Sequence, residues 1–313
     1  MTQRTTARAP ATLGNLGAGF DLLGLCLDIP PCDLVTITRA PRPGVRVTAI
    51  VDARTDQPVA LPTDPAQNTA TAGLLALCKD RQLEWGMDVR IQKGIPLGSG
   101  MGGSAASAAA AIVAASGLLE APLSDDELFD YALIGEAVAS GAAHGDNLAP
   151  CLFGGLQLVG HAGRTRVPVP QGVHCVVVHP HMRLDTRTAR EVLAQPYPLA
   201  QVVDQMGHLA GLLCAAYTGD ARAFARAAQD VLVEPRRAAL VPGFEQVKAA
   251  AMRAGASSCS LSGAGPSVFA LCLSLAQAHA VRDAMVDAFA THAARRADGY
   301  VCSMDAAGAA LVE

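Results

Sequence analysis

Hydrophobic and polar positions alternate with two different periods along this chain, which predicts strands and helices mixed from one end to the other. Residues 33–39 and 45–51 alternate with a period of two and are rich in β-branched side chains, which is typical of strands. The Pro-Arg-Pro-Gly segment between them favours a hairpin. Further strands are expected at residues 87–92, 153–159, 173–179, 258–261, 267–273 and 299–305.

Helical spacing of apolar residues predicts the helices. Ser124 and Glu127 stand three positions apart, as in a capping box, so we expect a helix to begin there. Gly255 is placed to end another helix. Helices are expected at residues 68–83, 104–119, 124–138, 199–217, 221–233, 245–254 and 277–295, and a loop at residues 140–147.

The length of the chain, 313 residues, favours two domains. The least regular crossing lies at residues 160–171, where we expect the domain boundary. The predicted domains are therefore residues 1–165 and residues 166–313.

The composition describes a protein with ample material for packed cores, since 51% of the residues are hydrophobic and 17% are charged. The net charge is −4, and no segment forms a polybasic patch, which argues against nucleic-acid and membrane partners. Binding of an anion therefore requires a local site. No apolar run is long enough to cross a bilayer, and the N-terminus does not resemble a signal peptide, so a cytoplasmic location is expected.

Nine cysteines stand at irregular spacings without a Cys-x-x-Cys pair, which favours reduced, buried thiols. His179 and His181 form a His-x-His pair. No further residue with the spacing of a zinc site accompanies them, so we interpret the pair as part of a strand end.

A first glycine-rich loop precedes the helix expected at residues 104–119. Residues 96–106 read Pro-Leu-Gly-Ser-Gly-Met-Gly-Gly-Ser-Ala-Ala. Glycines let a backbone approach a ligand closely, and the free N–H groups of a helix N-terminus bind anions, so the loop predicts a phosphate site. No Gly-Lys-Ser/Thr follows, which excludes a Walker A loop. A dinucleotide loop (Gly98-x-Gly100-x-x-Gly103) and a tight turn without a ligand stay open as alternatives.

A second glycine-rich loop, Ser-Gly-Ala-Gly-Pro-Ser at residues 262–267, lies between two expected strands. Alone, this loop is equally typical of a hairpin turn. Two such loops about 160 residues apart indicate a site between domains, where ligands commonly bind.

Together the two loops resemble those of the GHMP kinase superfamily, whose members carry a P-x-x-x-G-L-G-S-S-A-A loop and a later S-G-A-G-P/S loop. Four further segments resemble the homoserine kinase branch. They are Ala-Thr-Leu-Gly-Asn-Leu-Gly-Ala-Gly-Phe-Asp at 11–21, His-Gly-Asp-Asn-Leu-Ala-Pro at 144–150, Asp-Thr-Arg-Thr-Ala-Arg at 185–190, and Glu-Pro-Arg-Arg at 234–237 with Val-Pro-Gly-Phe at 241–244. The resemblance covers nearly the whole chain.

This resemblance implies an α+β fold of two domains, the first like ribosomal protein S5 and the second ferredoxin-like, with nucleotide and substrate between them. It implies ATP-dependent phosphorylation of the L-homoserine hydroxyl to O-phospho-L-homoserine, a step of threonine biosynthesis, by direct in-line transfer. Mg²⁺ is expected with ATP. A homodimer is expected because it is the commonest assembly.

The resemblance also implies the substrate residues. Arg190 and Arg237 are expected at the substrate carboxylate, which a guanidinium can bind with two hydrogen bonds. Asp21 and Asn15 are expected near its ammonium or hydroxyl end. The other substrate residues are His144, Asn147, Thr186 and Gly263, and the catalytic residues are Asp21, Asn147 and Arg190.

For the nucleotide, the resemblance implies contacts from the first loop and from two residues before it, and a metal site of hard oxygen ligands. The expected ATP contacts are Asn68, Lys93, Pro96, Leu97, Gly98, Ser99, Gly100, Met101, Gly102, Gly103, Ser104, Ala105 and Ala106. Ser104 and Glu136 are expected to bind Mg²⁺. The chain departs from the family at Gly103, which replaces the first of two serines.

Three other functions each fit part of the sequence. A GHMP kinase for mevalonate or a sugar would not need both Arg190 and Arg237. A ligand-binding relative without catalysis has the missing serine as its only support. A Rossmann dehydrogenase would need an acidic residue that closes a βαβ unit, and Glu120 follows a helix end instead.

Overall fold

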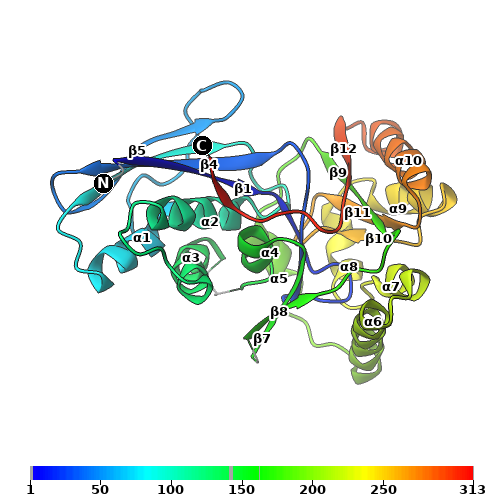
Figure 1. Ribbon diagram of the computed structural model, residues 1–313. Helices are drawn as coiled ribbons and strands as arrows, with labels where there is room; N and C mark the ends of the chain where they lie inside the picture. The colour runs from blue at the N-terminus through cyan, green and yellow to red at the C-terminus, as the bar shows by residue number, and fades with distance from the viewer. Residues whose placement is uncertain (1–2, 141–143, 162, 313) are drawn as a thin grey trace.

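The computed structural model describes residues 3–140, 144–161 and 163–312, and its largest sheet has five strands (Figure 1). In spatial order these are β13 (Ala310–Val312), β1 (Arg4–Pro10), β4 (Cys32–Ala40), β6 (Gly86–Lys93) and β5 (Gly44–Asp52). Two helices, α1 (Thr69–Asp80) and α2 (Gly103–Ser116), cover one face of this sheet, and α3 (Asp125–Ser140) packs against both of them on the side away from the sheet. All eight alanines of α2 are buried, which lets this helix lie close to β1 and β4.

The strands expected at residues 33–39 and 45–51 are present as β4 and β5, but the predicted hairpin between them is wrong. Strand β6 lies between the two, antiparallel to β4 and parallel to β5. Met87, Val89 and Ile91 of β6 are fully buried. A central position for this strand buries that apolar row under the helices, which outweighs the local preference for a hairpin.

Helix starts follow the predicted caps. The side chain of Asn68 accepts a hydrogen bond from the Ala70 N–H at the start of α1. Ser124 and Glu127 bond each other's backbone N–H groups before α3, which confirms the capping box.

A second sheet of four strands lies beside the first glycine loop, where the Thr12 N–H donates to the Met101 carbonyl. Its order is β2 (Thr12–Gly14), β3 (Leu23–Cys26), β7 (Leu156–Gly160) and β8 (Gly163–Val167), and α4 (Leu148–Phe153) packs against it. The sequence pattern did not predict β1, β2, β3, β8, β13 or α4, nor the short helices at residues 186–191 and 234–237. It expected irregular structure around β8, and that strand lies across the proposed boundary at residue 165.

The third sheet, with order β10 (Ser258–Leu261), β11 (Val268–Cys272), β9 (His174–Pro180) and β12 (Ala297–Cys302), packs against α9 (Phe244–Arg253) and α10 (Leu275–Ala293). β10 and β11 pair as expected around the second glycine loop. The division into residues 1–165 and 166–313 stays a proposal, and β13 joins the sheet otherwise built from the first part.

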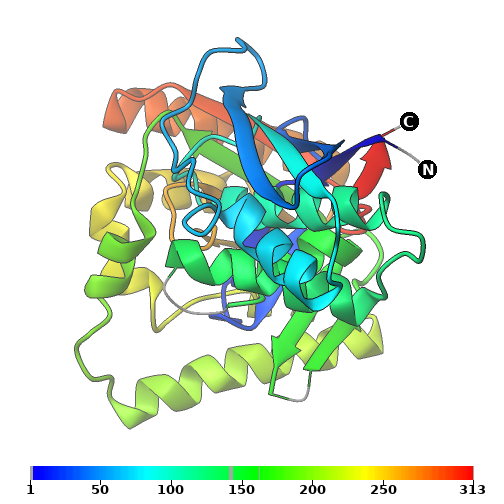
Figure 2. The same ribbon diagram turned by 90° about the vertical axis from the view of Figure 1, so that its left-hand side faces the viewer.

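Four shorter helical segments and one long helix complete the chain. They are α5 (Thr186–Glu191), α6 (Leu199–Thr218), α7 (Ala221–Ala227), α8 (Glu234–Arg237) and the 3-10 helix Ala238–Leu240. Helix α7 ends earlier than predicted, because the Asp230 carboxylate accepts the N–H groups of Leu232, Val233 and Glu234 and so forms a turn. Figure 2 shows α6 along the outside of the molecule.

All nine cysteines are free thiols, as predicted, but only six of them are buried: Cys32 and Cys78 are half-buried, and Cys214 is exposed. Within the described residues, no helix combines the length and apolar character that crossing a bilayer requires. Residues 141–143 of the loop expected at 140–147 lie outside the described residues.

Candidate active site

A cavity of about 430 Å³ joins both glycine loops to residues from the N-terminal loop, α3, α5 and α8. The loops touch each other. The Ser262 hydroxyl donates to the Gly100 carbonyl at 2.7 Å, and the Ser267 N–H donates to the Ser99 carbonyl at 3.1 Å. Both loops therefore line one cavity, as a shared ligand site requires, and its place between two domains stays a prediction.

The first glycine loop needs its glycines for its backbone conformation. Gly98, Gly100 and Gly102 have φ of 61°, 75° and 66°, where side chains other than glycine are strained. A Cβ on Gly102 would also lie 1.9 Å from the Thr12 hydroxyl oxygen. The loop then enters α2 at Gly103, so free backbone N–H groups at this helix start lie at the cavity.

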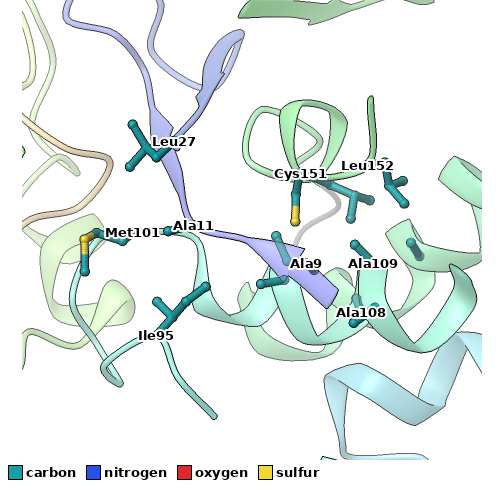
Figure 3. Packing of buried hydrophobic residues seen from close by; sticks show 14 of the residues in the cluster. Ala9, Ala11, Leu27, Ile95, Met101, Ala108, Ala109, Cys151 and Leu152 are labelled. Atoms are coloured by element: carbon teal, nitrogen blue, oxygen red, sulfur yellow. The ribbon is translucent and has the colours of Figure 1, made fainter. Parts of the chain in front are cut away.

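Most of the expected ATP residues line the cavity: Asn68, Lys93, Pro96, Leu97, Gly98, Ser99, Gly100, Gly102, Gly103 and Ser104. Met101, Ala105 and Ala106 do not, because their side chains are fully buried. Met101 belongs to the same apolar cluster as Ala11 and Ile95 (Figure 3).

Lys93 forms buried hydrogen bonds beneath the first glycine loop. Its ammonium pairs with the buried Asp33 carboxylate and donates to the Gly103 carbonyl at 2.6 Å and to the Ser107 hydroxyl at 2.8 Å. Asp33 also accepts the N–H groups of Gly94 and Ile95, both at 3.1 Å. This buried network ties β4 and the loop to α2. Nothing in the sequence pattern marked Asp33 as a partner.

Ser104 and Glu136 lie together, as the metal assignment requires. The Ser104 hydroxyl donates to the Glu136 carboxylate at 3.0 Å. Burial, together with the nearby Asp146 carboxylate, raises the pKa of Glu136 to about 7. A hydroxyl and a buried carboxylate at the end of a phosphate loop are hard oxygen donors, so these residues fit a divalent cation such as Mg²⁺.

At the other end of the cavity, Asp21 pairs with Arg190. The two terminal nitrogens of Arg190 donate to the two Asp21 oxygens at 3.1 and 2.9 Å. The His144 ring nitrogen Nδ1 lies 3.5 Å from the same carboxylate. The pKa of His144 is lowered, mainly by burial, so its ring is neutral near pH 7.

Arg237 and Asn15 converge on the second glycine loop. Arg237, 3% exposed, donates to the Gly263 carbonyl at 3.0 Å and to the Ala189 carbonyl at 2.9 Å. Asn15 donates to the same Gly263 carbonyl at 3.3 Å and accepts the Asp21 N–H at 3.1 Å. Burial lowers the pKa of Arg237, and the nearby positive charge of Arg190 acts in the same direction.

Asn147 connects the two ends of the cavity. Its side-chain oxygen accepts from the Thr12 hydroxyl at 2.9 Å, and its amide donates to Asp146 at 3.3 Å. Burial, and secondarily Asp21, raises the pKa of Asp146 to about 7. Thr186, the first residue of α5, completes the expected substrate residues at the cavity wall.

Sequence reasoning missed Thr12, which lies in the segment that resembles the family but carried no predicted role. It also missed Arg183, which lines the cavity beside Gly98. No local pattern distinguishes this arginine from a surface residue.

His179 and His181 lie away from this cavity. His179 exchanges a hydrogen bond with Ser267 at 3.1 Å, and His181 lies 3.1 Å from the Asp298 carboxylate. In the described part of the chain, no three histidine, cysteine, aspartate or glutamate residues gather in a cluster that fits a metal ion.

Comparison with known proteins identifies the family. The model of the GHMP kinase N-terminal domain matches residues 68–155, and that of the GHMP kinase C-terminal domain matches residues 210–291. A homoserine kinase of Xylella fastidiosa (strain 9a5c) is 46% identical over 306 residues, covering 98% of this chain and 93% of that protein. One of Xanthomonas campestris pv. campestris (strain B100) is 48% identical over 284 residues, covering 91% and 87%.

Solved structures agree. The crystal structure of homoserine kinase from Cytophaga hutchinsonii matches with a TM-score of 0.93 and 37% identity, covering 100% of this chain and 98% of that one. An L. major mevalonate kinase shares the fold at a TM-score of 0.67 and 18% identity, covering 98% of each chain. The predicted α+β GHMP kinase fold is thus confirmed, and the chain belongs to the homoserine kinase family of the GHMP kinases.

Proposed function

We propose that this enzyme transfers the γ-phosphate of ATP to the side-chain hydroxyl of L-homoserine and releases O-phospho-L-homoserine for threonine biosynthesis. The observation that carries the proposal is one cavity with two unlike ends. A glycine loop with a helix N-terminus forms one end, and Asp21, Arg190 and Arg237 form the other. The first end suits phosphates and the second suits a zwitterion.

At the nucleotide end, backbone N–H groups of the glycine loop and of the start of α2 would hold the phosphates. Ser104 and Glu136 would hold Mg²⁺, which neutralises phosphate charge when it is bound. The absence of a serine at position 103 does not remove this pair, since Ser104 and Glu136 bond each other directly. Lys93 would act mainly by fixing the Gly103 carbonyl.

At the substrate end, Arg190 and Arg237 would bind the carboxylate of L-homoserine, and Asp21 would bind its ammonium group. Asn15 would fix Asp21 through the Asp21 N–H. His144, Thr186 and the Gly263 backbone would complete the walls.

The reaction needs little covalent work from the protein. Positioning of the two reactants and neutralisation of charge supply most of the rate in phosphoryl transfer. We assign direct in-line attack by the substrate hydroxyl, with Asp21, Asn147 and Arg190 holding the hydroxyl and the transferred group in line. The hydroxyl proton would pass to a phosphate oxygen or to solvent, without a dedicated base.

The alternatives have weaker support. Mevalonate carries a carboxylate but no ammonium group, and a sugar carries neither charge, so both would leave the Asp21 carboxylate without an ammonium group to bind. A ligand-binding relative without catalysis would not need the Ser104–Glu136 pair beside a phosphate loop.

A homodimer is also proposed. Support comes from α6, on which Leu199, Val203, Met206 and Tyr217 are each more than half exposed. Sedimentation velocity would test this, and a concentration-independent monomer would contradict it.

A coupled ADP-release assay with Mg-ATP tests the proposed reaction. L-Homoserine, L-serine, mevalonate and galactose are compared at equal concentration. Release with L-homoserine far above the others is expected. Release with mevalonate or galactose instead would contradict the roles of Arg190 and Arg237, and binding of ATP without release for any acceptor would favour a non-catalytic relative.

A further inference from the structure

The residues proposed to bind the two charges of the substrate are already bound to each other. Arg190 presents both terminal nitrogens to both oxygens of Asp21, at 3.1 and 2.9 Å. The two side chains are 33% and 22% exposed, so water screens the pair only in part. A two-point pair of this kind is among the stronger hydrogen-bonded ion pairs, and a ligand must compete with it.

The rest of the cluster offers Asp21 no equal partner. His144 is 3.5 Å away, and its ring is neutral near pH 7 because burial lowers its pKa. Asp146 is a second carboxylate close enough to repel Asp21. Arg237 is close enough to interact with Asp21 electrostatically, but its described hydrogen bonds go to carbonyl oxygens. An Asp21 carboxylate that lost Arg190 would therefore stay partly buried without a cation in hydrogen-bond contact, which is costly.

Arg190 can also donate a further hydrogen bond. Among the described residues its Nε atom is buried and has no hydrogen-bond partner. Arg237 bonds only to carbonyl oxygens, and it makes no ion pair with a carboxylate in the part of the chain that the structure describes. A ligand carboxylate that reaches this cluster meets two guanidinium groups, one of which Asp21 occupies.

We propose that the Asp21–Arg190 pair selects zwitterionic hydroxy acids by ion-pair exchange. A zwitterion replaces one internal pair with two, since its carboxylate takes Arg190 and its ammonium group takes Asp21. A hydroxy acid without the ammonium group either pairs with Arg237 alone or displaces Asp21 from Arg190, and in the second case Asp21 keeps no cation in hydrogen-bond contact. The inference rests on the proposed function, and it makes Asp21 a residue that opposes singly charged anions as well as one that binds the ammonium group.

The variant Asp21→Asn tests this exchange. Asp21 has a φ of 54°, a conformation that asparagine tolerates well, and its N–H bond to Asn15 is unaffected by the change. The measurement is the Kd of two ligands by titration calorimetry with a non-hydrolysable ATP analogue present. The ligands are L-homoserine and 4-hydroxybutyrate, which has the same chain without the ammonium group. Asp204→Asn on α6, 65% exposed, is the matched control.

The two ligands are expected to respond in opposite directions. In Asp21→Asn, L-homoserine should bind roughly 10- to 100-fold more weakly, because a charged hydrogen bond is lost. 4-Hydroxybutyrate should bind more tightly than to the wild type, by roughly 5- to 10-fold, because Arg190 is released from its internal partner. The control should change neither Kd.

Weaker binding of both ligands to Asp21→Asn would overturn the exchange, because it would make Asp21 a simple contact or a structural residue. Equal affinity of the wild type for the two ligands would overturn it too. Failure of the proposed function appears separately, as wild-type binding of L-homoserine without ADP release when the analogue is replaced by Mg-ATP. The opposite shifts in Kd are measurable in that case as well.

Discussion

Replacing Gly100 by alanine is expected to separate the two glycine loops and to disable the phosphate site. Gly100 has a φ of 75°, and a Cβ there would lie 2.5 Å from both the Gly265 and the Ser262 carbonyl oxygens. Both contacts are with backbone atoms of the second loop, which cannot swing aside as the end of a side chain can. The loops would have to move apart.

The magnitude follows from three terms. A side chain in the left-handed region costs about 1–2 kcal/mol. Separation of the loops weakens the 2.7 Å hydrogen bond from Ser262 to the Gly100 carbonyl, which contributes about 1 kcal/mol. The third term is the displacement of the Gly265 and Ser262 carbonyls from their present positions. Together the three terms give a loss of stability of about 2–4 kcal/mol. A shift of the phosphate site by about 1 Å costs roughly 100-fold in rate.

Gly219→Ala is the matched control. Gly219 has a φ of 73°, almost the same as Gly100, but a Cβ there would meet no atom within 4 Å. It ends α6, away from the cavity. This variant should lose about 1 kcal/mol of stability through backbone strain and keep its activity.

Thermal unfolding and steady-state ADP release on both variants distinguish the effects. We expect Gly100→Ala to lower kcat/KM for Mg-ATP roughly 100-fold, and Gly219→Ala to lower only the Tm. A wild-type kcat/KM in Gly100→Ala would show that contact between the loops does not position the phosphate site.

Three further predictions follow from the charges in and near the site. Glu136→Gln should raise the Mg²⁺ concentration for half-maximal ADP release at least about 10-fold. In the wild type, Mg²⁺ affinity should rise from pH 6 to pH 8, because the pKa of Glu136 is about 7 and the proton competes with the ion. A pH-independent Mg²⁺ requirement would contradict this. Arg237→Lys should raise the KM for L-homoserine about 10-fold with little change in the KM for ATP. The reason is that an ammonium group cannot keep the hydrogen bond to Gly263 and also bind a carboxylate with two hydrogen bonds. A raised KM for ATP with an unchanged KM for L-homoserine would instead assign Arg237 to the nucleotide site. Burial lowers the pKa of His179 to about 4, below its unfolded value of about 6.5, so the folded state disfavours its protonation. Stability should be full above pH 6.5 and fall as the pH drops toward 4, by up to about 3 kcal/mol, and His179→Gln, which can still bond Ser267, should flatten that dependence in urea unfolding.

Features set by neighbouring residues could be predicted from the sequence. The caps at Asn68 and Ser124 act within three residues, and both helices begin where those caps indicate. The two glycine loops carry their conformational requirements in their own composition, as the positive φ of Gly100 illustrates.

Partner choice between distant segments was not predictable. The strand expected to form a hairpin with β4 instead pairs with β6, since sheet order depends on which row of side chains the helices bury. Asp21 and Arg190 were each expected at the substrate, but their mutual pair joins residues 169 positions apart, which no local pattern records.

The sequence also does not predict which partners a buried side chain will bond. Lys93 was expected at the nucleotide, yet its three donor hydrogens are directed to Asp33, Ser107 and the Gly103 carbonyl. The need to pair a buried ammonium group explains this arrangement, and it exists only once β4 and α2 are packed together.

One cavity is proposed to bring the γ-phosphate of ATP to the hydroxyl of a bound zwitterion, and ³¹P NMR of the reaction with Mg-ATP and L-homoserine detects the product of that transfer. We predict a phosphomonoester signal split by the two protons of the adjacent CH₂ group, growing in equal amount with ADP. ADP with inorganic phosphate alone, or no consumption of ATP, would contradict the claim.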